Sequence, residues 1–155
     1  MPYHFDFDPT NRILRCRFEG RVTDKALKEF FRLAAEHAAR IDPRGAVTDL
    51  SAVTSFEVSP QTIRELAKEA PALSNPDRHR CVVASSPQIF GMVRMFEIAG
   101  EATRPNLHVV RTIEEAWSIL DVEAPQFSPL PDKSCVFDSL APVTNRESAT
   151  RQQGV

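Results

Sequence analysis

Apolar and polar residues alternate along the first part of the chain in the manner of half-buried β-strands. Aromatic and polar residues alternate over residues 3–7, and a second alternation covers residues 13–22. Between them, Asp8, Pro9 and Asn11 form a segment with the composition of a turn. The pattern predicts an N-terminal antiparallel hairpin with one face toward the core and one toward solvent.

Helical patterns and short apolar runs then follow one another in regular order. Apolar residues at helical spacing predict helices that end near Ile41, begin at Ser59, span about residues 89–102 and begin at Thr112. Between them, residues 46–50, 80–85 and 107–110 are expected to form buried strands, and residues 51–56 a loop. This order predicts an α/β domain with a mixed sheet of about five strands, parallel in its later strands, and about four helices.

The character of the chain changes near Glu123. Residues 123–155 contain repeated prolines and many Ser, Thr, Asp and Gln residues, so we expect one folded domain over residues 1–122 and a partly disordered tail over 123–155. A short apolar patch at residues 135–137 is the part of this tail that we expect could dock on the domain or on a partner.

Composition adds limits on the partners. The chain has 155 residues, of which 42% are hydrophobic and 26% charged, with a formal net charge of −2. Arg12, Arg15, Arg17 and Arg21 form a local basic face, but this charge balance argues against a nucleic-acid partner. There is neither an apolar run long enough for a transmembrane segment nor a basic N-terminal signal region, so we expect a cytoplasmic protein.

The usual signatures of chemistry are absent from the sequence. Cys16, Cys81 and Cys135 share no short spacing, and the four histidines form no helical ligand pair, so neither a metal site nor a disulfide framework is expected. No glycine-rich phosphate loop or nucleophile elbow occurs, so no cofactor and no catalytic residue is predicted. Asp49 and Glu57 are the carboxylates nearest to predicted strand ends, but no His or Lys in the same loops accompanies them.

Two helix starts share the sequence Ser-Pro-Gln, at Ser59 and at Ser86. In a parallel sheet both starts lie at the carboxyl edge of the strands, where backbone N–H groups favour anions. A candidate anion or regulatory loop therefore comprises six residues: Asp49, Ser51, Ser55, Ser59, Ser85 and Ser86. The alternative is that Ser59 and Ser86 only cap their helices.

The helix expected over residues 89–102 is apolar on more than one side, which predicts that it is buried on more than one side. Phe90, Met92, Met95 and Phe96 form a candidate face for an apolar ligand or a protein partner. The alternative is ordinary core packing of these four side chains.

The segment Asp49-Leu50-Ser51-Ala52-Val53, followed by Thr54-Ser55-Phe56-Glu57-Val58-Ser59-Pro60, resembles the signature of STAS domains. The stretch from Arg80 to Leu120 is similar to small bacterial proteins of the SpoIIAA-like (STAS/SEC14-like) group. The resemblance covers roughly residues 3–122 and implies a STAS-like fold. In phosphorylated members of the family the regulatory serine stands where this chain has Val58, so the resemblance does not imply the kinase-driven switch, although Ser59 follows directly.

Three functions are compatible with these observations. The first is a non-enzymatic STAS-like interaction or regulatory module that acts through protein contacts, with a homodimer as one form. The second is a carrier or sensor of an apolar or lipid-like small molecule, suggested by the Met-rich helix and by the SEC14-type relationship. The third is an enzyme of unknown reaction, for which the sequence assembles no acid, base or nucleophile.

Overall fold

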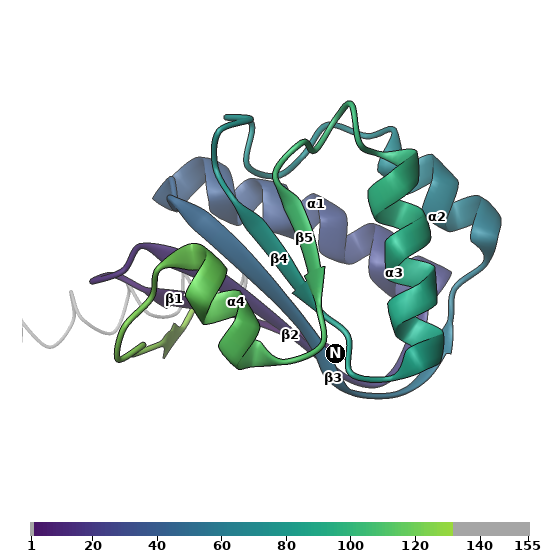
Figure 1. The fold of residues 1–155 in the computed structure, drawn as a ribbon, viewed down its shortest axis with the longest axis horizontal. Coiled ribbons are helices and arrows are strands. Elements are labelled where there is room, and N and C mark those ends of the chain that lie inside the picture. The colour runs from purple at the N-terminus through teal and green to yellow at the C-terminus, as the bar shows by residue number, and fades with distance from the viewer. Residues whose placement is uncertain (1, 132–155) are drawn as a thin grey trace, which may run out of the picture.

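A computed structural model describes residues 2–131 of the chain as an α/β domain (Figure 1). The elements follow in the order β1 (Tyr3–Asp8), β2 (Ile13–Thr23), α1 (Asp24–Ile41), β3 (Gly45–Glu57), α2 (Pro60–Ala67), β4 (Arg80–Val83), α3 (Pro87–Ala99), β5 (Leu107–Val110), α4 (Ile113–Leu120) and β6 (Ser128–Pro129). The predicted α/β class, the antiparallel hairpin and the four helices are confirmed.

The described strands form one mixed sheet in the order β5-β4-β3-β2-β1-β6. Strands β2 to β5 run parallel, whereas β1 is antiparallel to both of its neighbours. Because strand-helix-strand crossovers are right-handed, a sheet that grows in one direction places its crossover helices on one face. Helices α1, α2 and α3 accordingly share one face, and α4 lies on the other (Figure 1).

The prediction of a loop at residues 51–56 is wrong, because these residues belong to β3. The strand continues to Glu57, and its second half pairs with the end of β2, from Ala52 opposite Glu19 to Glu57 opposite Thr23. Register shifts after Arg17 and after Gly20 let the two strands stay paired over this length. The segment contains residues that favour extended structure: Val53, Thr54 and Phe56. Its many hydroxyl side chains instead suggested a loop.

The sheet separates two cores. Along β3 and β4, Val47, Cys81 and Val83 face α4 and are almost completely buried. The larger core lies on the opposite face, where Leu14, Cys16 and Phe18 of β2 meet the apolar side of α1. Each central strand is therefore covered on both faces, as expected of parallel strands.

The chain continues to contact the domain beyond residue 122. Strand β6 pairs with β1, and the N–H of Leu130 donates to the carbonyl of Phe5 at 2.8 Å. Phe127 stacks on Trp117, with ring centres 5.7 Å apart, and lies under the guanidinium of Arg15. Residues 127–130 thus contact the folded domain, and the apolar patch at residues 135–137 lies outside the described residues.

Within residues 2–131, no helix has the length and apolar character needed to cross a membrane.

Candidate functional site

The centre of the sheet carries small side chains on the face that α1, α2 and α3 cover. Residues paired across parallel strands point to the same face, so Leu14, Ala46, Arg80 and Leu107 form one row. A second row comprises Cys16, Thr48, Val82 and Val109. In the middle of these rows Ala46, Thr48 and Val82 remain partly exposed. On the other face of the same strand, Val47 is 0% exposed.

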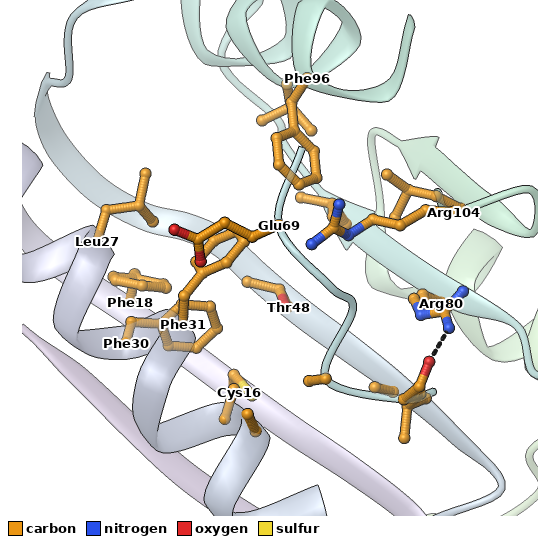
Figure 2. A pocket seen from close by; sticks show the side chains of 18 of the residues that line it. Cys16, Phe18, Leu27, Phe30, Phe31, Thr48, Glu69, Arg80, Phe96 and Arg104 are labelled. Carbon is orange, nitrogen blue, oxygen red and sulfur yellow. Dashed lines mark hydrogen bonds between the residues drawn. The ribbon is translucent and has the colours of Figure 1, made fainter. Parts of the chain in front are cut away.

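This partial exposure in a covered sheet face comes from a cavity of about 480 Å³ between the sheet and the helices. Its floor is formed by β2, β3 and β4, one wall by α1, and the opposite wall by α2, α3 and the connection that follows α2. Sites for small molecules have volumes of roughly 300–1,000 Å³ and are mostly apolar. The cavity matches such sites in volume and in the predominantly apolar character of its lining (Figure 2).

Aromatic side chains line the part of the cavity next to α1. Phe30 of α1 packs edge-on against Phe18 of β2, with ring centres 4.7 Å apart. Phe31 reaches across to Phe96 of α3, with ring centres 5.8 Å apart. These contacts connect the α1 wall to the floor and to the α3 wall, and they give the cavity an apolar, aromatic interior.

Two arginines line the cavity, Arg80 on the side opposite Phe18 and Phe30, and Arg104 with its guanidinium carbon 5.7 Å from the centre of the Phe31 ring (Figure 2). Arg104, in the connection between α3 and β5, is 6% exposed. It donates through Nη1 to the carbonyl of Ala67 at 3.1 Å, and its guanidinium lies over the ring of Phe96. Burial, reinforced by the positive charge of Arg80, lowers the pKa of Arg104 to about 10, so it stays protonated at neutral pH.

Arg80 begins β4 and is 8% exposed. Its Nη2 donates to the carbonyl of Leu73 and, at 3.4 Å, to that of Asn75. Its Nε and Nη1 are buried and have no hydrogen-bond partner in the described part of the chain. Burial lowers the pKa of Arg80 as well.

Charged residues frame the mouth of the cavity. Lys28 and Arg32 on α1 and Glu69 after α2 are exposed and contribute to the lining. They lie between solvent and the aromatic interior, so the mouth is polar while the interior is apolar apart from Thr48 and the two arginines.

The predicted apolar face on α3 is divided by the structure. Of its four residues, Phe96 lines the cavity, whereas Phe90, Met92 and Met95 pack on the neighbouring core without lining it. Only Ile89 and Val93 are fully buried on α3, and Ile98 is 64% exposed. The expectation that this helix is buried on more than one side is therefore wrong, because α3 lies at the outer end of the helical layer (Figure 1).

The hydroxyl groups of the predicted anion loop largely bond to carboxylates. Ser51 donates to Asp49 at 2.6 Å, and Ser55 donates to Glu57 at 2.9 Å, both on the extended β3. Glu57 is also paired with Arg21, and the hydrogen bond from that guanidinium holds the pKa of Glu57 below its usual range. These contacts give the strand an acidic character that does not favour an anion.

The two helix starts differ in their caps. Ser59 accepts a hydrogen bond from the N–H of Thr62, so it caps α2, and its own N–H donates to Asp24. Ser86 precedes α3 without a side-chain cap, and its neighbour Ser85 is exposed. Val58, at the position where the STAS signature has its regulatory serine, is buried.

The cysteines and histidines of the described residues form no catalytic or metal-binding cluster. Cys16 and Cys81 are buried free thiols, and burial raises the pKa of Cys81 to about 12. His79 contacts His108 through ring nitrogens 3.0 Å apart. No group of three or more metal-ligating side chains occurs within residues 2–131.

Sequence reasoning did not identify Arg80 and Arg104. A signal for Arg80 existed, because a cation inside a strand expected to be buried on both faces requires a specific partner. Arg104 carried no local signal, since its contacts with Ala67 and Phe96 depend on the tertiary fold.

Comparison of the chain with models of protein families and with curated proteins finds no match. The STAS-like assignment therefore stays a prediction based on residues 49–60 and on the order of elements.

Proposed function

We propose that the protein is a non-enzymatic binding module, a carrier or sensor, for an apolar or lipid-like small molecule held in the cavity between α1, α2, α3 and the sheet. The single observation that carries this proposal is the cavity of about 480 Å³ over the small residues of the central strand. Ala46 and Thr48 occupy positions where larger apolar residues would close such a core.

The lining supports binding more than catalysis. Glu69 is the only carboxylate among the described lining residues, and it lies exposed at the mouth. Cys16 and Cys81 are held in the thiol form by their raised pKa values. An activated nucleophile requires a pKa near the working pH and a partner within hydrogen-bond reach, and the two thiols meet neither condition.

The alternative of a protein-interaction module, including a homodimer, rests on the STAS resemblance. Within residues 2–131, the large apolar side chains that are exposed are Ile98 on α3 and Ile119 on α4. They lie on helices that cover opposite faces of the sheet, so these two side chains form no joint patch. The cavity is therefore the stronger basis for a function.

The experiment combines native mass spectrometry of protein purified from its host with titration of the neutral dye Nile red. We expect a retained small molecule of defined mass, and saturable dye binding by protein from which it has been extracted. Ala46→Leu, which fills the cavity floor, should weaken dye binding at least tenfold while leaving stability equal or higher. Ala52→Leu, on the exposed part of the same strand, serves as the matched control and should change neither property.

A bare chain mass together with no saturable dye binding would contradict the proposal. So would unchanged dye affinity in Ala46→Leu. A dimer without a bound small molecule and without dye binding would instead support the interaction module.

A further inference from the structure

The cavity contains a buried positive charge that the described protein residues do not neutralise. Arg80 and Arg104 are each more than nine-tenths buried, and neither takes part in the salt bridges found within residues 2–131. The buried carboxylates are satisfied: Asp6, 2% exposed, accepts bonds from both Arg15 and Arg17, and Asp8 accepts hydrogen bonds from Thr10, Asn11 and Gln126. The absence of a carboxylate partner for Arg80 and Arg104 therefore sets the cavity apart.

Each arginine has a structural contact that uses only part of its donors. Arg104 bonds to the last residue of α2 through Nη1, and Arg80 bonds through Nη2 to the connection after α2. The other two nitrogens of Arg80 stay unpaired and buried. A buried donor without a partner is costly, and a buried guanidinium without an anion is more so. Holding the connections in place therefore explains one nitrogen of each guanidinium, Nη2 of Arg80 and Nη1 of Arg104. It does not explain why the other donors of these guanidinium groups are buried.

Glu69 does not fill this role. The charge of Glu69 opposes the lowering of the pKa of Arg104, but its carboxylate is exposed at the mouth and forms no ion pair with either arginine. The unpaired Nε and Nη1 of Arg80, which packs beside Ala46 on the sheet floor, are enclosed by protein atoms. Both arginines nevertheless line the cavity, so an anion bound there would lie beside their two positive charges.

Positive charge and aromatic surface meet in the same space. Arg80 lies on the side opposite Phe18 and Phe30, and the guanidinium carbon of Arg104 lies 5.7 Å from the centre of the Phe31 ring (Figure 2). We propose that the ligand is a single-chain amphiphile with an anionic head group, a carboxylate or a phosphate, which binds Arg80 and Arg104 while its apolar chain lies along the aromatic wall formed by α1. This inference rests on the proposed function and specifies the class of its ligand.

The test compares three compounds with the same twelve-carbon chain class: laurate, lauryl phosphate and the neutral dodecanol, each titrated by displacement of Nile red from the full-length wild-type protein. We expect at least one anionic compound to bind tenfold or more tightly than dodecanol, because hydrogen bonds to charged groups are the stronger kind. The tighter of the two anions identifies the head group. This comparison needs no substitution, so it does not depend on the folding of a variant.

Two variants locate the effect. Arg80→Met and Arg104→Met should lose the preference for the anion while dodecanol affinity stays within about threefold of wild type. Arg64→Met, which removes an exposed arginine from α2, is the matched control and should keep the preference. Circular dichroism of each variant reports whether the fold is retained.

Equal affinity for dodecanol and both anions would overturn the inference while leaving the proposed function intact. Failure of all three compounds to displace the dye, or failure of the dye to bind, would overturn the proposed function as well. A preference for the anion that survives in both cavity variants would place the anionic group elsewhere and overturn the assignment to Arg80 and Arg104.

Discussion

The guanidinium carbon of Arg104 lies 4.9 Å from the centre of the Phe96 ring. The contact joins the last turns of α3 to the connection before β5, and both side chains line the cavity. An aromatic face stabilises a cation that has left water, so Phe96 partly replaces the solvation that Arg104 has lost.

From this contact we expect Phe96→Ala to weaken Nile red binding by roughly tenfold, because the substitution opens the α3 wall and leaves Arg104 less supported. Phe90→Ala on the same helix is the matched control, since Phe90 is also partly buried but does not line the cavity. Both variants should lose about 1–3 kcal/mol of stability, which chemical denaturation measures. Equal loss of dye affinity in both would show that α3 acts through general stability.

Asp8 provides a prediction about acid stability. It is 0% exposed and accepts hydrogen bonds from the N–H groups of Thr10, Asn11 and Gln126 and from the Asn11 amide. Burial raises the pKa of Asp8, but these hydrogen bonds outweigh it and hold the pKa below its usual range. Because the folded pKa is the lower one, the stabilisation is complete above the unfolded value of about 3.9 and is lost as pH falls through the folded pKa.

Asp8→Asn should therefore reduce stability by about 1–3 kcal/mol at neutral pH, since one of its ends must present a donor to donors. The variant should also show a shallower loss of stability below about pH 5 than the wild type. Urea unfolding across that pH range measures both effects. Asp121→Asn, at an exposed left-handed position that Asn also tolerates, should behave like the wild type.

The contact of Phe127 with the domain can be measured in solution by tryptophan fluorescence. It stacks on Trp117, the only tryptophan in the chain, so the fluorescence of that residue reports the contact. Phe127→Ala should shift Trp117 emission to longer wavelength and lower stability by about 1–2 kcal/mol. Phe90→Ala, on the opposite side of the sheet, should lower stability without the spectral shift; a shift in both variants would refute the assignment.

Ser59 is close to Asp24, and this constrains any regulation by phosphorylation. The Ser59 N–H donates to Asp24 at 2.9 Å, so a new negative charge at Ser59 would meet an existing carboxylate. We expect Ser59→Asp to destabilise the fold by about 1 kcal/mol and Asp24→Asn to relieve part of that loss in the double variant. Ser86→Asp is the control, because Ser86 makes no cap bond and an acid there adds one; thermal unfolding compares the four proteins.

The sequence predicted the elements better than the site. Local signals include the alternation in residues 3–7 and 13–22 and the helix starts at Ser59 and Thr112, and the structure confirms them. The extension of β3 depended on the length of β2, which composition does not reveal. The cavity depends on which small residues align across strands, so Ala46 and Thr48 became informative only once the register with β2 and β4 was known. Phe96 was found because its helix is unusually apolar, whereas Arg104 is brought to the site by tertiary packing alone.

The small floor residues and the two buried arginines link occupancy of the cavity to the amount of folded protein. A molecule that fills the cavity and contacts Arg80 and Arg104 binds the native chain and not the unfolded one. At a free concentration one hundred times its dissociation constant, such a ligand adds about 2.7 kcal/mol to the free energy of unfolding. For a chain of this size that is a sizeable share of the usual total of about 5–15 kcal/mol. The lifetime of the protein against unfolding and proteolysis would then follow the supply of its ligand.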